Sequence, residues 1–117
     1  VWYIRASDQN LYMHVYGGNQ DGNNVVMHGD ESYAKTTRCN GPCPNSMFVL
    51  EREPSRPNAW YIRASDQDLY MHVWGGNQDG NNVVMHGDEN YAKRTRCNGP
   101  CPNSLFVLEC DILEIDN

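Results

Sequence analysis

The chain repeats itself at an offset of 58 residues. Trp2 to Glu51 reappears as Trp60 to Glu109, and 45 of the 50 aligned positions are identical. The five differences are Asn10/Asp68, Tyr16/Trp74, Ser32/Asn90, Thr36/Arg94 and Met47/Leu105. Two copies of one unit therefore account for almost all of the 117 residues.

A unit of this length is marginal alone, because a small chain buries only a modest share of its surface. We therefore expect residues 1–117 to form a single domain in which the two units share a core. Repeat one covers residues 1–51, a short stiff connector with Pro54 and Pro57 covers residues 52–59, and repeat two covers residues 60–109. A tail strand is expected over residues 110–117.

Short stretches of alternating apolar and polar residues are separated by Gly, Asn, Asp and Pro, which is typical of strands joined by turns. In repeat one the expected strands are residues 2–5, 11–16, 24–28 and 47–51, and no helix of any length is expected. The core candidates are Ile4, Leu11, Met13, Val15, Val25, Met27, Phe48 and Leu50. So few side chains cannot bury a face alone. The pattern predicts an all-β protein whose four-stranded repeats complete one another's core.

Charge and hydropathy exclude several classes of partner. The net charge is −6, from nine Lys and Arg against fifteen Asp and Glu, and the basic residues are scattered. A nucleic-acid binder needs a clustered basic face to displace counterions from phosphates. No apolar run approaches the roughly 18 residues of a membrane span. We expect a soluble protein that neither binds nucleic acid nor inserts into a membrane.

All four histidines occupy equivalent places in the two repeats. His14 and His72 lie late in the second strand, next to a Gly-Gly turn, and His28 and His86 end the third strand. Because these strands form a hairpin, His14, the Gly17-Gly18 backbone, His28 and Asp30 are expected to converge. Imidazole, carboxylate and free N–H groups can hold sugar hydroxyls, and Tyr16 or its counterpart Trp74 could pack on a pyranose ring.

A structural interpretation of the same histidines stays open. They could cap strand ends and bond to nearby carbonyl groups without contacting any ligand. The residues alone favour neither interpretation.

The two histidine motifs resemble those of a known lectin family. His14-Val-Tyr-Gly-Gly18, followed by Val25-Val-Met-His-Gly-Asp30, is similar to the repeat of the mytilectins, the mussel galactose-binding β-trefoil lectins. In that family each repeat carries His-Pro-x-Gly-Gly and then His-x-Asp-x-His. Here Val15 or Val73 replaces the Pro, and Ser32 or Asn90 replaces the last His.

The resemblance implies a β-trefoil-type fold and one galactose or N-acetylgalactosamine site per repeat. With the neighbouring aromatic residues, the carbohydrate-binding set is His14, Tyr16, Gly17, Gly18, His28, Asp30 and Ser32 in repeat one, and His72, Trp74, Gly75, Gly76, His86, Asp88 and Asn90 in repeat two.

Five cysteines point to disulfides. The Asn-Gly-Pro between Cys39 and Cys43 favours a tight turn and a local bridge, repeated as Cys97–Cys101, while Cys110 is left over for an interchain bridge. Such a framework is typical of secreted, extracellular proteins.

Metal sites are weaker alternatives. The two cysteine pairs with histidine could hold zinc. A calcium loop over residues 19–22 would put Gly17 at its first ligand position and His28 where a bidentate Glu belongs. We therefore expect no metal and no cofactor.

No nucleophile with a base, and no pair of acids in a cleft, is evident. Duplicated shallow sites suit binding, because copies add valency, whereas catalysis needs one enclosed constellation. We therefore expect a non-catalytic, multivalent lectin that recognises cell-surface or secreted glycans. The alternative is a structural or interaction scaffold with disulfide-pinned loops, and a metal-dependent binder is the third candidate.

The trefoil resemblance implies three repeats, and this chain shows two. A third unit could lie outside the chain, a neighbouring chain could supply units, or two long repeats could close a barrel with the tail. We favour a homo-oligomer.

Overall fold

The structure is a computed structural model that describes residues 1–37, 41–95 and 99–109. Its strands form small antiparallel sheets, which confirms the predominantly β character of the chain. In repeat one, β1 (Met13–Val15) pairs with β2 (Val25–Met27). In repeat two, β5 (Met71–Val73) pairs with β6 (Val83–Met85) in the same register. Each repeat therefore carries one identical hairpin.

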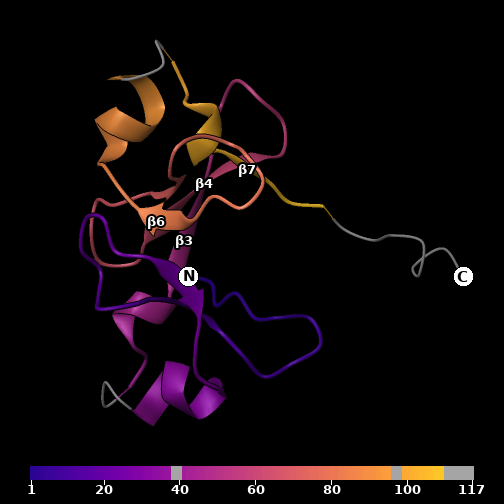
Figure 1. Cartoon of the computed structure of the whole chain (residues 1–117), viewed down its shortest axis with the longest axis vertical. Helices are drawn as coiled ribbons and strands as arrows, with labels where there is room; N and C mark the ends of the chain where they lie inside the picture. Colours follow the sequence, from indigo (N-terminus) through magenta and orange to yellow (C-terminus); the bar gives the residue numbers. More distant parts are fainter. Residues whose placement is uncertain (38–40, 96–98, 110–117) are drawn as a thin grey trace, which may run out of the picture.

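A three-stranded sheet joins the repeats, in the order β3-β4-β7. Strand β3 (Phe48–Arg52) ends repeat one, β4 (Ala59–Ala64) begins at the connector and opens repeat two, and β7 (Phe106–Val107) ends repeat two. Five residue pairs, from Phe48 with Ala64 to Arg52 with Trp60, link β3 to β4. The two strands lie at the centre of the molecule, where the halves meet (Figure 1).

The first predicted strand, residues 2–5, is reduced to single bridges. Trp2 pairs with Phe48, and Arg5 pairs with Tyr12. The equivalent segment of repeat two is the six-residue strand β4, which lies between β3 and β7. The prediction of equal strands was therefore wrong in extent. The same sequence forms a longer strand where it has a neighbour on both sides.

The expectation of no helix was wrong for four short segments that lie between the strands. They are the π-helices η1 (Tyr33–Thr37) and η3 (Tyr91–Thr95), and the 3-10 turns η2 (Pro44–Ser46) and η4 (Pro102–Ser104). In Figure 1 the coils of η1 and η3 lie at opposite ends of the molecule. In the described ranges no helix is long and apolar enough to cross a membrane.

The main core is shared unequally between the repeats. Its buried members are Val15 and Phe48 from repeat one, and Ile62, Ala64, Leu69, Met71 and Met85 from repeat two. Of the other predicted core residues, Ile4, Met13, Val25 and Leu50 are only partly buried against this cluster. The side chain of Met27 is 42% exposed, whereas its repeat counterpart Met85 is fully buried. The surroundings of the two repeats therefore differ although 45 of their 50 aligned residues are identical.

An ion-pair network fastens the two repeats together. Glu51 of repeat one accepts hydrogen bonds from the Tyr70 hydroxyl at 2.7 Å, Arg63 Nε at 2.8 Å and Lys93 Nζ at 3.2 Å. Burial alone would raise the pKa of Glu51, but these three hydrogen bonds outweigh it and lower the pKa below its usual value. The carboxylate is thus held ionised between three donors of repeat two.

Candidate functional site

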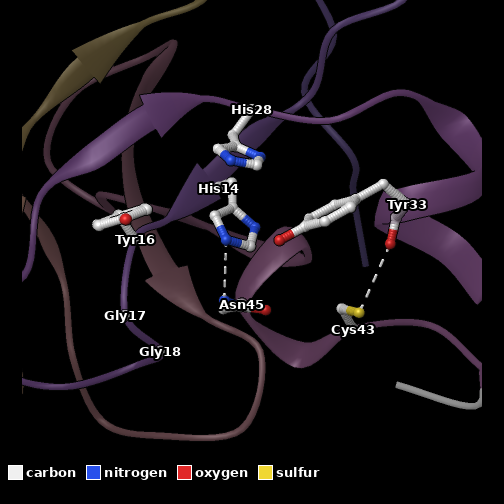
Figure 2. Close-up of a pocket in the computed structure, with 8 residues that line it drawn as sticks. All are labelled: His14, Tyr16, Gly17, Gly18, His28, Tyr33, Cys43 and Asn45. Atoms are coloured by element: carbon white, nitrogen blue, oxygen red, sulfur yellow. Dashed lines mark hydrogen bonds between the residues drawn. The ribbon is translucent and has the colours of Figure 1, made fainter. Parts of the chain in front are cut away.

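Each repeat carries an open pocket at the same place. The first has a volume of about 590 Å³ and is lined by His14, Tyr16, Gly17, Gly18, His28, Tyr33, Cys43 and Asn45. The second has a volume of about 410 Å³ and is lined by His72, Trp74, Gly75, Gly76, Tyr91, Cys101 and Asn103. Most of the residues that the sequence predicted for a site therefore meet around one pocket in each repeat. Figure 2 shows the pocket of repeat one.

His14 forms the floor of the first pocket and is only 6% exposed. Its Nδ1 lies 3.1 Å from the buried Ser46 hydroxyl, and its Nε2 lies 3.3 Å from the Asn45 amide nitrogen. That amide nitrogen also donates to the Val15 carbonyl at 3.0 Å. Both ring nitrogens of His14 are therefore bonded within the protein.

These contacts assign the proton on His14. Because the Asn45 amide nitrogen is a donor to Val15, the His14 Nε2 that it also contacts must be an acceptor. The proton then sits on Nδ1, which donates to Ser46, and the ring is neutral. His72 has the same arrangement with Ser104 at 3.1 Å and Asn103 at 3.2 Å.

The histidine contacts depend on the short turn η2. Pro44 at the start of this turn has a fixed φ that suits a first helical position. The turn presents Asn45 and Ser46 to the end of β1, and the Asn19 side chain donates to the Pro44 carbonyl at 3.1 Å. The segment before the last strand thereby becomes a wall of the pocket.

Aromatic rings surround this floor. The His28 ring centre lies 5.3 Å from that of His14 and 5.0 Å from that of Tyr33, and Tyr16 lies 6.2 Å from His28. Figure 2 shows the Tyr33 hydroxyl directed toward His14 and Asn45. Tyr16 is 62% exposed and stands at the rim. The pocket thus combines a polar floor with an exposed ring at its edge.

The second pocket has the same rings with one substitution. Trp74, which is 55% exposed, replaces Tyr16 and lies 5.0 Å from His86. His86 stacks on His72 at 5.4 Å between ring centres, and its ring is tilted against that of Tyr91 at 4.8 Å. It is not among the residues that line the second pocket. The indole offers a larger apolar face at this rim than the phenol does in repeat one.

His28 and His86 share an unusual feature. In each, the buried Nδ1 has no hydrogen-bond partner among the described residues.

The Gly17-Gly18 turn supplies backbone to the pocket rim. Both glycines have positive φ, at 92° and 102°, which L-residues rarely adopt. The Gly18 N–H already donates to the Val15 carbonyl at 3.1 Å, and the Gly18 carbonyl accepts from the Asn23 side chain at 2.9 Å. The Gly17 N–H has no acceptor among the described residues. Of the two predicted donors, Gly17 is therefore the one available to a ligand.

The Tyr33 side chain leaves no room for a side chain at position 29, so this residue must be glycine. Its φ is +81°, and a Cβ at this position would lie only 2.7 Å from Tyr33 Cγ. The Tyr33 ring thus packs directly on the glycine and is held over the pocket. Gly87 and Tyr91 repeat this contact at 2.5 Å.

Asp30 and Asp88 lie outside the residues that line the pockets. The Asp30 carboxylate accepts a hydrogen bond from the Tyr33 N–H at 3.0 Å, and Asp88 does the same for Tyr91. Each acid therefore caps the start of a helical element that carries a pocket tyrosine. Ser32 and Asn90 are exposed and also lie outside the pocket linings.

Sequence reasoning missed three lining positions in each repeat. They are Tyr33, Cys43 and Asn45, with Tyr91, Cys101 and Asn103 as their counterparts. The available signal was the Cys-Pro-Asn-Ser sequence, identical at 43–46 and 101–104. This sequence lies outside the predicted strands, and no local pattern links it to His14.

Cys43 and Cys101 are disulfide-bonded, and both are buried. The Cys43 sulfur lies 3.7 Å from the Tyr33 carbonyl oxygen. Cys39, Cys97 and Cys110 lie outside the described residues, so the predicted pairing stays a prediction. Throughout the described part of the chain, no group of three His, Cys, Asp or Glu side chains could hold a metal ion.

Comparison with protein-family models, with curated proteins and with solved structures finds no match to this chain.

Proposed function

We propose that the protein is a non-catalytic lectin built on β-trefoil-type repeats, with one site for galactose or N-acetylgalactosamine in each repeat. The observation that carries the proposal is the duplicated pocket. Both copies combine a neutral, buried histidine, a Gly-Gly turn and an exposed aromatic ring at the rim. A pyranose has one apolar face and a ring of hydroxyls, and this combination complements both.

The individual roles follow from the contacts. The Asn45 side-chain oxygen has no donor among the described residues, so it can accept from a sugar hydroxyl, while the Gly17 N–H can donate to one. Tyr16 packs on the apolar face of the sugar. His14 positions Asn45 through its Nε2, so its effect on the sugar is through that amide. Asp30 holds Tyr33 in place.

Open sites of this kind typically bind a monosaccharide weakly, with a Kd of about 1 mM, or roughly −4 kcal/mol. Useful avidity then depends on several sites engaging one glycosylated surface, outside the cell in the proposed setting. Two sites per chain supply the first step, and assembly of chains into a homo-oligomer would add more.

Titration calorimetry with free galactose tests the proposal by counting sites. The wild-type chain should bind two equivalents, and Trp74→Ala should bind one, because the exposed indole is lost without disturbing the core. Trp2→Ala is the matched control, since Trp2 is 56% exposed but lies outside both pockets. It should keep both sites.

Two outcomes would contradict the lectin assignment. Absence of binding to galactose and to a glycan array would favour the scaffold interpretation, and binding abolished by EDTA would favour a metal-dependent binder. Two sites retained in Trp74→Ala would instead refute the assignment of the pocket.

A further inference from the structure

Counterpart residues in the two repeats differ in exposure in a consistent way. Met85 is fully buried, whereas Met27 is 42% exposed; Tyr61 is fully buried, whereas Tyr3 is only partly buried. At the other end of the repeat the difference reverses. Phe48 is fully buried, whereas Phe106 is only partly buried. Repeat one is therefore open at its first strand, and repeat two is open at its last.

The two open edges border one apolar groove of about 340 Å³. From repeat one it is lined by Ile4, Met13, Val25, Val26 and Met27, and from repeat two by Ile62, Met71, Val83, Phe106, Val107 and Leu108. Val107 is 63% exposed and Leu108 is 44% exposed. We call residues 2–6 with β2 the head edge, and residues 79–82 with 106–109 the tail edge.

Inside the chain, the counterparts of these two edges are already joined to each other, at the junction between repeat one and repeat two. The loop of repeat one pairs with β6 of repeat two: the Gly22 N–H donates to the Met85 carbonyl at 2.6 Å, and the Met85 N–H donates to the Asn23 carbonyl at 2.9 Å. The Asp21 carboxylate accepts from the Gly87 N–H at 3.1 Å. The segment of repeat one that corresponds to the tail edge is thus bound to the segment of repeat two that corresponds to the head edge.

The outer edges carry the same groups without these bonds. Asp79 and Gly80 are the counterparts of Asp21 and Gly22, and Met27 and Gly29 are the counterparts of Met85 and Gly87. Among the described residues, the Gly80 N–H and the Asp79 carboxylate have no hydrogen-bond partner, and neither do the N–H groups of Met27 and Gly29 outside the hairpin. The donors and acceptors thus match across the two outer edges.

Charges complete the match. Between the repeats Glu51 binds Arg63, Tyr70 and Lys93. The counterparts of these three residues are Arg5 on the head edge, Tyr12, which pairs with Arg5, and Lys35, which lies over the Tyr12 ring. The counterpart of Glu51 on the tail edge is Glu109.

These outer groups lack the contacts of their counterparts. Among the described residues, the Arg5 side chain donates only to the local carbonyls of Ala6 and Gln9, at 2.9 and 3.0 Å. Lys35 lies over the Tyr3 and Tyr12 rings, and its one ion pair within the described ranges is with Glu31, at 3.4 Å. Glu109 is exposed. The head edge therefore presents cations where the tail edge presents a carboxylate.

We propose that a second copy of this chain docks head to tail in the groove, its head edge on the tail edge of the first. The register follows from β3 with β4, where Phe48 pairs with Ala64 and Leu50 with Ile62. Phe106 then pairs with Ala6 of the next copy and Leu108 with its Ile4, and Glu109 meets its Arg5 and Lys35. Such an interface is heterologous, so it leads to rings or to open chains of molecules.

The chain's own residues 110–117 are the competing occupant, because they follow directly after Glu109. Their sequence adds Asp111, Glu114 and Asp116 and contains no Lys, Arg or Tyr. They cannot supply the cations and phenol that Glu109 lacks. A second copy supplies all three, and this favours it.

Sedimentation of the full chain carrying Cys110→Ser tests the proposal without an interchain disulfide. We expect at least twice the single-chain mass at high micromolar concentration. Val107→Lys on the tail edge and Met27→Lys on the head edge should each sediment as single chains, since both place a charge on an exposed apolar position. Tyr16→Lys, at a similarly exposed position outside the groove, should still assemble.

Mixing the two edge variants distinguishes head-to-tail docking from any other contact. Each variant retains one intact edge, so a mixture of Val107→Lys with Met27→Lys should form a 1:1 dimer and nothing larger. Single chains in the Cys110→Ser protein, or no dimer in the mixture of folded variants, would overturn the proposal. Assembly that appears only after removal of residues 110–117 would identify the tail as the occupant. Galactose binding by Val107→Lys and by Met27→Lys should be unchanged, because neither position lines one of the two proposed sugar pockets.

Discussion

Replacing Met85 by Ala, and separately Met27 by Ala, makes the same chemical change in two surroundings. Met85 has no exposed surface and packs in the shared core, whereas Met27 is 42% exposed. The flanking residues are identical in the two repeats, so local propensity cancels in the comparison. The difference in the free energy of unfolding then reports the surroundings alone.

The expected magnitude follows from burial. Truncating a fully buried Met to Ala costs about 2–5 kcal/mol, because transfer energy is lost and a cavity remains. We expect about 3 kcal/mol for Met85→Ala, which at roughly 4 °C per kcal/mol lowers Tm by about 12 °C. For Met27→Ala we expect about 1 kcal/mol or less in the single chain, since much of its side chain already contacts water.

Urea unfolding followed by tryptophan fluorescence is the appropriate assay, at a protein concentration low enough to keep chains separate. The slope of free energy against urea should stay constant, and the two midpoints should differ. Equal losses for the two variants would refute the reasoning, because the repeats would then bury this methionine alike. A Met27→Ala cost that grows with protein concentration would be consistent with the proposed docking.

The remaining predictions concern acid stability and one glycine. The pKa of Glu51 is lowered despite burial, and hydrogen bonding from Ser55 lowers the pKa of Glu53. Both carboxylates therefore stabilise the fold at a pH above the pKa of about 4.3 that Glu has in the unfolded chain. This contribution is lost as the pH falls through the lower pKa values of the folded state. Thermal unfolding against pH should show this loss in acid, and Glu51→Gln should flatten it; an unchanged profile would contradict the network. Gly29→Ala should destabilise the fold more than Gly18→Ala, because both have positive φ but only Gly29 faces the Tyr33 ring; equal Tm losses would exclude that contact.

The sequence located the pocket through local patterns. Strand alternation placed His14 beside the Gly17-Gly18 turn, and the hairpin brought His28 to it. The role of Asn45 was not predicted, because it contacts His14 from 31 residues further along the chain. No local sequence pattern indicates such a contact. Asp30 looked like a ligand group, yet its carboxylate caps η1. Short polar side chains serve both purposes, and the sequence does not distinguish them.

Strand lengths show a similar limit. Residues 2–5 and 60–63 are identical, but only the second segment lies inside a longer strand. Propensity is the same for both, so the presence of neighbouring strands decides the outcome. Core membership follows the same rule, as Met27 and Met85 demonstrate.

The placement of η1 and η3 at opposite ends of the molecule affects how one chain could use two ligands (Figure 1). Tyr33 and Tyr91, which begin these elements, line the two pockets, so the pockets lie far apart along the molecule. Two short glycan branches attached at one point could not reach both pockets at once. If the pockets bind sugar, a single chain is already a cross-bridge between separate glycans, and it could agglutinate cells before any assembly takes place.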